Sequence, residues 1–454
     1  MSPWSFCIHS IVNKILFPAQ EYFELPPVDA LKFGDLVAID LSASTNSYTH
    51  GLHRYPAKFI PQIPRWAIRQ YTQAGDTVLD PFSGSGTTIV EAVAEQRSAI
   101  GIDLDPLACA IGGAKTAALD PVKIGRAGAD ALRAAVSWSG ALRVPLAGVK
   151  NFDHWFSPSA WRDLQALKEA IDASPCTEVE RRFLLVVFSS IVRAVSNADD
   201  QTQKTYVSGT LKKVPPDVFP TFEKRLSKAI GAISQLNSHM GEFSARAINA
   251  SASEMPIATG SIDLIVTSPP YLDSVDYPYN LMLEYFWLGK DLGIKSRDDY
   301  NSLRRSSIGS KSPVRRNDVP DYIENLVSIQ DVPNYRKAAV GPYFTGMLEH
   351  FREANRVLTN DGHYVLVIGN SRTQQGMLPL HDALVQLASS VGLQMDHAFG
   401  YRIRRHYMKF PRQGRGGIIL MDWVITFRKA KGKLEQPPRL PMIDAQLSPD
   451  AVAN

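Results

Sequence analysis

The chain has 454 residues, of which 44% are hydrophobic and 21% charged, a balance typical of a folded globular protein and unlike a disordered or fibrous one. Its 49 lysines and arginines exceed its 45 acidic residues by only four, so the total charge does not by itself indicate a nucleic-acid-binding protein. Three scattered cysteines are too few for a disulfide framework or a zinc site. The longest apolar run, 183–192, is about half of what a bilayer requires. We therefore expect a soluble cytoplasmic protein of two or three domains with no signal peptide, membrane segment or metal.

The first strong pattern, at 76–105, predicts half of a nucleotide-binding α/β unit. A short β-branched run at 77–79 enters a loop rich in glycine and serine. A helix follows, for which Thr88 and Glu91 fit a capping box. The next apolar run ends in Asp103. This order of elements is typical of a parallel sheet, in which ligands bind beyond the carboxyl ends of the strands.

Two glycines make that loop a candidate ligand site. Gly84 and Gly86 allow the backbone to turn tightly and to approach a ligand, and Asp103 is placed to accept hydrogen bonds from two ribose hydroxyls. A phosphate-binding P-loop is excluded because no lysine follows the glycines. The dinucleotide-binding pattern lacks its third glycine, where Ile89 stands. The surrounding strand, helix and acid favour a nucleoside site over a plain turn.

Residues 121–245 change character. Periodic apolar positions at 161–171 and 183–195 predict helices, so we interpret this region as a largely helical insertion. The α/β pattern resumes with a buried strand at 262–266.

The four residues Ser268 to Tyr271 follow that strand and should border the same crevice as the glycine loop. Pro269 and Pro270 remove two backbone donors and leave carbonyl groups free to accept hydrogen bonds from a ligand amino group. Ser268 adds a hydroxyl acceptor, and Tyr271 offers a ring for stacking. The set suits a flat heterocycle with an exocyclic amino group.

The remaining chain alternates between irregular and regular patterns. We expect, in order, a polar irregular stretch at 290–340, a helix at 343–358, a turn at 360–362, a strand at 364–368, a β-hairpin from 395–403 and 417–427, and a loose tail from 431.

The motif pair at 80–88 (DPFSGSGTT) and 267–271 (TSPPY) closely resembles the S-adenosylmethionine-dependent DNA amino-methyltransferases, which methylate N4 of cytosine or N6 of adenine. Three further segments resemble the same family. Residues 53–64 are similar to the part that closes over the methionine end of the cofactor, 102–106 to its ribose-binding acid, and 356–368 to its helix-to-strand unit after the catalytic loop.

The resemblance covers about half of the chain: 50–120, 246–285 and 341–430. It implies an α/β fold, a Rossmann-like methyltransferase whose mostly parallel sheet is closed by a C-terminal β-hairpin, plus the largely helical insertion. The domains expected are a catalytic methyltransferase domain (1–120, 246–289 and 341–430), a helical insertion that is a candidate for target recognition (121–245), a basic loop insertion (290–340) and a flexible tail (431–454).

By resemblance, S-adenosylmethionine is the cofactor. The residues expected to bind it are Lys58, Phe59, Asp80, Pro81, Phe82, Gly84, Ser85, Gly86, Thr87, Asp103 and Ser251. Ser251 stands where the family often has an acid near the cofactor's adenine. The catalytic residues implied are Ser268, Pro269, Pro270 and Tyr271. They would hold the amino group of a flipped base for direct methyl transfer, with no covalent enzyme intermediate.

Basic residues cluster in two segments that flank the expected catalytic core. Residues 398–433 hold ten lysines and arginines against one acid, and 301–316 hold five and no acid. We expect DNA phosphate contacts from the following side chains: Arg304, Arg305, Lys311, Arg315, Arg316, Arg402, Arg404, Arg405, Lys409, Arg412 and Arg415. Double-stranded DNA is the expected partner, and a cognate restriction endonuclease encoded nearby is a second.

Several alternatives stay open. The serine in the first position of the catalytic segment favours N4-cytosine, while N6-adenine remains the alternative. A catalytically idle DNA-binding or specificity module and an RNA methyltransferase are alternatives of other classes. Cytosine-C5 chemistry is rejected because Pro175-Cys176 falls in the helical insertion, away from any strand end.

Overall fold

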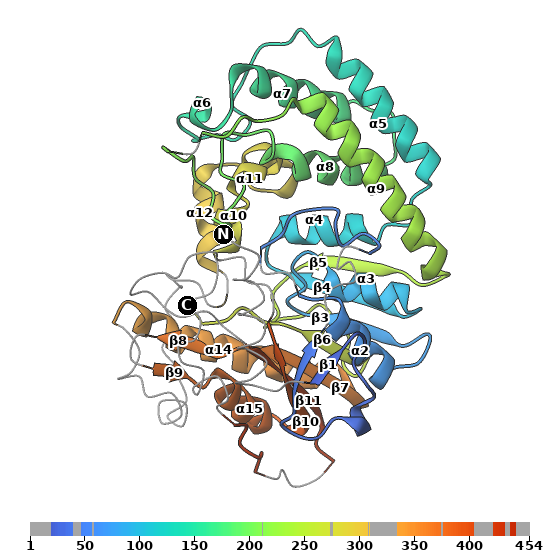
Figure 1. Cartoon of the computed structure of the whole chain (residues 1–454), viewed down its shortest axis with the longest axis vertical. Helices are drawn as coiled ribbons and strands as arrows, with labels where there is room; N and C mark the ends of the chain where they lie inside the picture. The colour runs from blue at the N-terminus through green and yellow to red at the C-terminus, as the bar shows by residue number, and fades with distance from the viewer. Residues whose placement is uncertain are drawn as a thin grey trace, which may run out of the picture.

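The computed structural model describes residues 20–39, 47–56, 59–210, 212–272, 276–306, 308, 334–373, 376–403, 421–431 and 436–441. Its centre is a nine-stranded sheet in the order β1-β2-β10-β11-β7-β6-β3-β4-β5 (Figure 1). The strands are β1 (Gln20–Tyr22), β2 (Leu36–Ile39), β3 (Thr77–Asp80), β4 (Ser98–Asp103), β5 (Ala245–Asn249), β6 (Ile262–Thr267), β7 (Leu358–Ile368), β10 (Leu393–Arg402) and β11 (Met421–Lys429), with β8 (Ser371–Thr373) and β9 (Gly376–Leu378) as a separate pair.

The sheet is parallel except where β11 runs antiparallel to both β7 and β10. The predicted α/β class and the closing hairpin are therefore confirmed. The helices are α2 (Gln62–Tyr71), α3 (Thr87–Ala94), α4 (Pro106–Lys115), α5 (Pro121–Val136), α6 (Phe152–Trp155), α7 (Pro158–Asp172), α8 (Glu178–Val192), α9 (Val218–Met240), α10 (Tyr277–Asn280), α11 (Met282–Leu288), α12 (Arg297–Ser306), α14 (Asn334–Val357) and α15 (Leu380–Ser390), with short 3-10 turns η1 (Val28–Ala30) and η2 (Lys290–Leu292).

Helices cover both faces of the sheet because its central strands are apolar on both sides. In β6, Leu264 and Val266 pack in the core that includes α2 and α3, whereas Ile265 packs in the core that includes α14 and α15. The two-residue alternation of a strand sends neighbouring side chains to opposite faces. Between them the two cores fix the register of the strands that carry the site.

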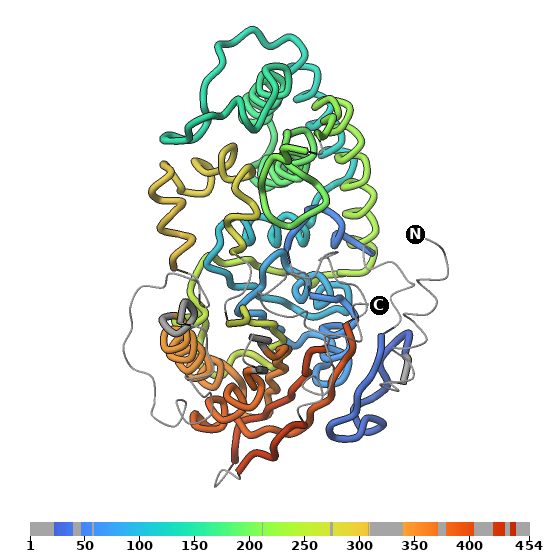
Figure 2. The backbone as a smooth tube through the Cα atoms, turned by 60° about the vertical axis from the view of Figure 1, so that its left-hand side comes forward, coloured from blue at the N-terminus to red at the C-terminus, as the bar shows by residue number. Residues whose placement is uncertain are grey.

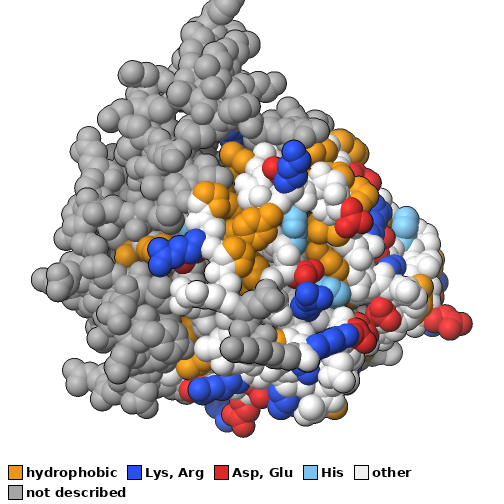
Figure 3. Space-filling view, turned by 90° about the horizontal axis from the view of Figure 1, so that it is seen from below, with side chains coloured by type: hydrophobic (Ala, Val, Ile, Leu, Met, Phe, Trp, Pro, Cys, Tyr) orange, Lys and Arg blue, Asp and Glu red, His pale blue; other side chains and the backbone are white. Residues whose placement is uncertain are grey.

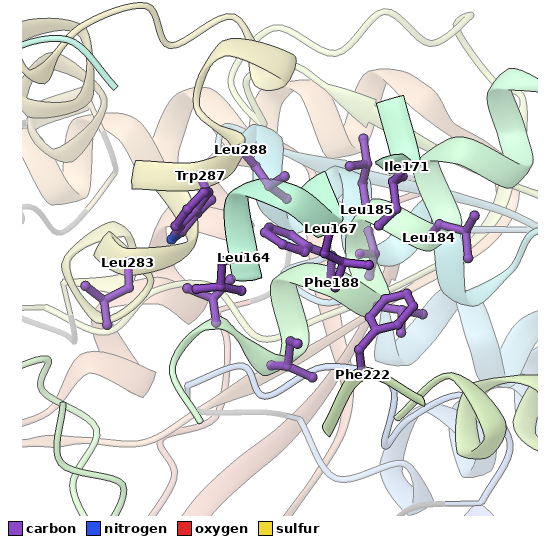
Figure 4. Packing of buried hydrophobic residues seen from close by; sticks show 14 of the residues in the cluster. Leu164, Leu167, Ile171, Leu184, Leu185, Phe188, Phe222, Leu283, Trp287 and Leu288 are labelled. Carbon is purple, nitrogen blue, oxygen red and sulfur yellow. The ribbon is translucent and has the colours of Figure 1, made fainter. Parts of the chain in front are cut away.

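The expected helical insertion is a layer of α5 to α9 above the sheet (Figure 1). Its core is built around buried side chains such as Leu167, Phe188 and Phe222, and Trp287 of α11 packs at one side of this cluster, edge-on against Phe188 (Figure 4). Residues 277–306 lie against this layer rather than forming a separate loop (Figure 2).

Three local predictions were wrong. The stretch 290–340 is not irregular throughout, because 297–306 forms α12, anchored by the buried Tyr300, whose hydroxyl donates to the Pro278 carbonyl at 2.8 Å. The expected turn at 360–362 lies inside β7, where the pairing with β6 shifts its register. The expected capping box is absent, since the helix begins after Gly86 with no side-chain cap.

The face seen from below the sheet mixes lysines and arginines with aspartates and glutamates (Figure 3). Within the described residues, none of the helices has the length and apolar character needed to cross a bilayer.

Candidate active site

Three parallel strands bring the predicted motifs to one edge of the sheet. β3 pairs with β4 on one side and with β6 on the other, so their carboxyl ends lie together. The glycine loop follows β3, Asp103 ends β4, and Ser268 to Tyr271 follow β6. The structure therefore assembles into one site what the sequence separates by nearly two hundred residues.

Asp80 ties the two loops to each other. Its carboxylate, 3% exposed, accepts hydrogen bonds from the hydroxyls of Thr267 at 2.6 Å and Thr88 at 2.7 Å, and from the Phe82 N–H at 3.1 Å. Burial raises the pKa of Asp80 to about 6, although these hydrogen bonds oppose the rise. The carboxylate thus sets the spacing between the glycine loop and the catalytic segment. Thr88, which was expected to cap the helix, serves this network instead.

The glycine loop forms a tight cradle. Gly86 has a φ of +81°, and a Cβ there would lie 2.9 Å from the Cα of Gly112. Gly84 has a φ of +47°, and a Cβ there would lie 3.2 Å from the Tyr55 ring. Both positions require glycine on conformational grounds. Beneath the loop, the fully buried Lys115 donates to the Ser85 carbonyl at 2.7 Å and to its hydroxyl at 3.2 Å.

Sequence reasoning missed Lys115, because a lysine in a helix is usually read as exposed. Of the other predicted contacts near the loop, Pro81 and Thr87 are buried, and Phe82 is half-buried.

Asp103 stands where the ribose-binding acid was expected. Its carboxylate accepts hydrogen bonds from the N–H groups of Gly84 at 2.8 Å and Asp105 at 2.9 Å. Burial, followed by the nearby Asp105 carboxylate, raises the pKa of Asp103 to about 7. Asp105 itself caps α4 and accepts the Tyr285 hydroxyl. Asp103 therefore has acceptor capacity left for a ligand's hydroxyl groups.

Ser251 lies just beyond β5, beside that acid. The Asn249 side chain donates to the Asp103 carbonyl at 2.9 Å and thereby ties the Ser251 loop to the end of β4. The Ser251 hydroxyl accepts the Ser253 N–H at 3.1 Å and so shapes the turn. The sequence analysis did not predict Asn249 as a site residue, although a polar residue at the end of a strand could have indicated it.

A buried histidine supports this side of the site. The ring nitrogens of His350 lie 3.2 Å from the Ala252 carbonyl oxygen and 2.9 Å from the Tyr364 hydroxyl, and the ring packs edge-on against Phe82. Burial lowers its pKa to about 4, so the imidazole is neutral at physiological pH. His350 therefore holds the Phe82 ring in place by packing against it.

The segment Ser268 to Tyr271, predicted to be catalytic, is partly accessible. Ser268, Pro270 and Tyr271 are half-buried, whereas Pro269 is buried. Burial raises the pKa of Tyr271 well above its ordinary value, and the neighbouring Asp422 carboxylate adds to the rise. The phenol therefore stays protonated.

The N-terminal segment lies against the glycine loop. Tyr55 lies between Gly84 and Tyr277, with the two tyrosine rings stacked at 6.1 Å. Phe59 is half-buried. Lys58 lies outside the described residues.

A buried carboxylate fastens this segment to the sheet. Glu91 of α3 is fully buried, and the Arg65 guanidinium donates to it at 2.7 Å and 3.1 Å. The His50 ring lies 2.6 Å from the same carboxylate. These partners hold the pKa of Glu91 below its usual range against the cost of burial.

The candidate DNA contacts are only partly described. Arg304 forms an ion pair with Asp276 at 2.5 Å and lies over the Tyr279 ring at 5.2 Å, so this predicted contact serves to anchor α12. Arg305 is exposed, and Arg402 ends β10 half-buried. The remaining candidates lie outside the described residues: Lys311, Arg315, Arg316, Arg404, Arg405, Lys409, Arg412 and Arg415. In the described part of the chain, histidines, cysteines and acids form no cluster of three that could hold a metal ion.

A family model described as DNA methylase matches residues 34–112. The type II methyltransferase M.MvaI of Kocuria varians is 27% identical over 405 residues, which is 82% of this chain and 86% of the relative. The type II methyltransferase M.MjaII of Methanocaldococcus jannaschii is 39% identical over 77 residues, 17% of this chain and 14% of the relative. Among solved structures, a TehB-like SAM-dependent methyltransferase of Corynebacterium glutamicum covers 81% of this chain and 86% of its own, at 11% identity and a TM-score of 0.27.

Fold, site and matched family together define an S-adenosylmethionine-dependent methyltransferase. More narrowly, the match to the DNA methylase family model and the similarity to type II methyltransferases support a DNA amino-methyltransferase of the N4-cytosine and N6-adenine family. The resemblance read from the two motifs is confirmed, as is S-adenosylmethionine as cofactor.

Proposed function

We propose that this protein is a site-specific DNA methyltransferase that transfers a methyl group to N4 of cytosine. The main observation in support is that Ser268 to Tyr271 lie at the carboxyl end of β6. The hydrogen bond from Thr267 to Asp80 holds this segment next to the glycine loop. Type II methyltransferases among the relatives support DNA as the substrate. The choice of cytosine is supported by Ser268, since the adenine enzymes of this family more often carry Asp or Asn in that position.

The site fits S-adenosylmethionine, which when bound supplies an electrophilic methyl group on its sulfonium. Asp103 is the acceptor for the ribose hydroxyls, and the absence of side chains at Gly84 and Gly86 lets the ligand approach the backbone. Lys115 holds the Ser85 backbone in place from the buried side. Tyr55, over the loop, limits access to water.

The catalytic segment overcomes the weak nucleophilicity of an aromatic amine, whose lone pair is delocalised into its ring. The Ser268 hydroxyl and the Pro269 carbonyl accept hydrogen bonds from the amino group and orient its lone pair toward the methyl group. Transfer is direct, and positioning supplies much of the rate.

Base pairing hides this amino group in duplex DNA, so the target cytosine is flipped out of the helix before reaction. Stacking on the Tyr271 ring repays about 1–3 kcal/mol of the flipping cost. The clustered arginines and lysines, including the exposed Arg305, contact the DNA backbone. The helical layer from α5 to α9 is the candidate for reading the target sequence.

The test is to express the protein in a methylation-free host and to sequence the host DNA by a method that distinguishes 4-methylcytosine from 6-methyladenine. Methylcytosine at a single recognition site is the expected result. Methyladenine at a single site would instead establish the adenine alternative. If no modified base forms in the host or in vitro with added cofactor, the proposal is wrong, and competition between DNA and RNA substrates would then test RNA methylation.

A further inference from the structure

A cavity of about 420 Å³ lies where the helical layer meets the helices that follow the catalytic segment. Pockets of this volume are of the size that holds small ligands. Two parts of the chain line it, α6 with the loop before it and α11 with α12, through the following side chains: Lys150, Asn151, His154, Trp155, Met282 and Arg297. None of these is among the predicted cofactor-binding or catalytic residues, so the mechanism above does not explain the cavity.

Hydrogen bonds from two directions hold the walls of this cavity. The Arg297 N–H donates to the Ala147 carbonyl at 3.0 Å and so fixes the start of α12 against the loop before α6. Asn197 donates through its side chain to the His154 carbonyl at 3.1 Å and through its N–H to the Trp155 carbonyl at 2.8 Å. The backbone of the fold therefore determines the shape of the cavity.

The lining carries positive charge and hydrogen-bond donors. Lys150 and Arg297 are cationic, and the His154 ring adds an N–H donor. Within the described part of the chain, no acid lines the cavity; Asp153 and Asp298, next to two of these residues in the sequence, are exposed elsewhere. The lining is therefore complementary to an anion.

Arg297 has a guanidinium that is held in place while its donors are unused. It lies over the rings of Phe286 at 5.6 Å and Tyr300 at 5.7 Å, contacts that orient a flat cation. The side chains of Arg297 and Lys150 make no hydrogen bond or ion pair with another described residue. Because a guanidinium presents paired N–H donors that match two oxygens of a phosphate, an oxyanion of this kind fits Arg297.

The position of the cavity favours the backbone of DNA as the source of that phosphate. Helices α10, α11 and α12 follow the catalytic segment, and α6 packs against α11 through Phe152 and Trp287 (Figure 1). The exposed Arg305, predicted to contact DNA, is on the same helix as Arg297, about 12 Å further along its axis. The Trp155 ring adds an apolar wall that suits the sugar next to a phosphate.

We propose that this cavity binds a phosphate group of the DNA backbone between Lys150 and Arg297, with the adjacent sugar against Trp155. The inference rests on the proposed function, because it takes DNA as the substrate. A phosphate held here fixes the position of the duplex relative to the helical layer, and the contact carries no sequence information of its own.

The main test is Lys150→Ala, because this exposed side chain can be removed without disturbing the core. The Kd for duplex DNA of arbitrary sequence should rise about tenfold, the low end of the range for losing a hydrogen bond to a charged group. The slope of log Kd against log salt concentration should become shallower by about 1, as for the loss of one phosphate contact. The kcat at saturating DNA and the Kd for S-adenosylmethionine should stay within about twofold of wild type, because a phosphate contact positions the duplex and takes no part in the chemistry.

Arg297→Gln is the second variant, and it should raise the Kd for DNA by a similar factor. Its free energy of unfolding is measured alongside, because this variant also loses the contacts with two rings. Lys224→Ala and Arg126→Ala are the matched controls, since they remove exposed cations from α9 and α5, on the side of the helical layer away from α6 (Figure 1). Both controls should keep the wild-type Kd and salt dependence.

A wild-type Kd and salt dependence in Lys150→Ala would overturn the inference, as would an equal loss of affinity in Lys224→Ala. Variants that lost affinity for duplex RNA but not for DNA would make RNA the ligand and the inference wrong. Inorganic phosphate that bound wild type but not Lys150→Ala, with DNA affinity unchanged, would show a site for a free anion instead. A wild-type protein that methylates no DNA would contradict the proposed function, whereas an active enzyme with unchanged DNA affinity in Lys150→Ala would contradict only the phosphate site.

Discussion

At the carboxyl edge of the sheet, carboxylates are buried among hydroxyl and N–H donors, whereas in the helical layer a guanidinium is buried among carbonyl oxygens. Asp80, Asp103 and Asp105 make no ion pair within the described residues, and the pKa of each is raised by burial. Arg193, 6% exposed, makes no described ion pair either. It donates to the carbonyl oxygens of five residues: Asp199, Thr202, Gln203, Lys204 and Asn280.

The two arrangements differ in the hydrogen-bonding capacity that they leave for a ligand. The donors of Arg193 are taken up by five carbonyl groups, and these bonds fasten the loop that contains Asp199 to Asn280, the last residue of α10. Asp103 accepts only two backbone N–H groups and can still accept donors from a ligand. The half-buried Asp103, which can still accept hydrogen bonds, is therefore the candidate for ligand binding, whereas the hydrogen bonds of the buried Arg193 stabilise the fold.

The largest expected effect concerns the catalytic segment. Tyr271→Ala should lower methyl transfer by up to about 100-fold, because it removes a stacking surface worth about 1–3 kcal/mol to the flipped base. Binding of S-adenosylmethionine should survive, since the glycine loop and Asp103 are untouched. Methylation assays and calorimetric titration with the cofactor measure the two quantities separately.

The control is Tyr206→Ala, which changes an exposed tyrosine of the helical layer. Full activity in Tyr271→Ala would remove the ring from the mechanism.

Arg193→Ala tests the structural half of the comparison. Loss of its hydrogen bonds should lower the free energy of unfolding by about 3 kcal/mol, since several carbonyl groups lose a charged donor. The affinity for S-adenosylmethionine should stay within about twofold. Chemical denaturation and cofactor titration measure these effects.

Arg182→Ala on the same helix is the matched control. This exposed side chain pairs with Glu178, so its loss should cost less than about 1 kcal/mol. If Arg193→Ala weakened cofactor binding as strongly as it weakened folding, the separation of the two regions would fail.

The features that the sequence predicts are local ones, whereas contacts between residues far apart in the chain are not predicted. The glycine loop, Asp103 and Ser268 to Tyr271 are local patterns at strand ends, and the rule that parallel strands share an edge suffices to bring them together. The hydrogen bonds of His350 with Ala252 and of Asp80 with Thr267 join segments far apart in the chain. No local sequence pattern marks these pairs.

Asp422 illustrates the limit most clearly. In the sequence it is the lone acid of a basic stretch, which marks it as unusual but assigns it no partner. Its contact with Tyr401 depends on the register of β10 against β11, and a shift of one residue would turn it to the other face.

Asp103 supplies a pH-dependent prediction of intermediate size. Its carboxylate must be ionised to accept two ribose hydroxyls, and its pKa in the free protein is raised to about 7. The protonated fraction grows below that pH, so affinity for S-adenosylmethionine should fall about tenfold from pH 8 to pH 6. Asp103→Asn should bind more weakly at pH 8 and lose most of this dependence.

Calorimetry in buffers of different ionisation enthalpy should also detect proton release on binding near pH 7. Titration of the ligand itself would persist in Asp103→Asn, so the variant separates the two sources. A pH-independent affinity in the wild type would show that Asp103 does not bind the ribose.

The smaller of the two expected changes in stability lies between the two regions, at Glu284 of α11. This side chain is 4% exposed, and one of its oxygens has no hydrogen-bond partner. Burial raises its pKa to about 7, although Arg193 and Arg54 oppose the rise. A carboxyl group whose pKa is higher in the folded than in the unfolded state stabilises the fold fully below about pH 4.5, and that contribution is lost as the pH rises through about 7.

Glu284→Gln keeps the shape and removes the ionisation, so the variant should be more stable than wild type by about 2 kcal/mol at pH 8 and no more stable at pH 5. Denaturation curves at the two pH values measure the difference, and Glu223→Gln at an exposed position of α9 is the control. Equal destabilisation of Glu284→Gln at both pH values would mean that the carboxylate is ionised and satisfied by the two arginines. Glu284 would then resemble Arg193, whose hydrogen bonds are made within the fold, rather than the acids at the carboxyl edge of the sheet.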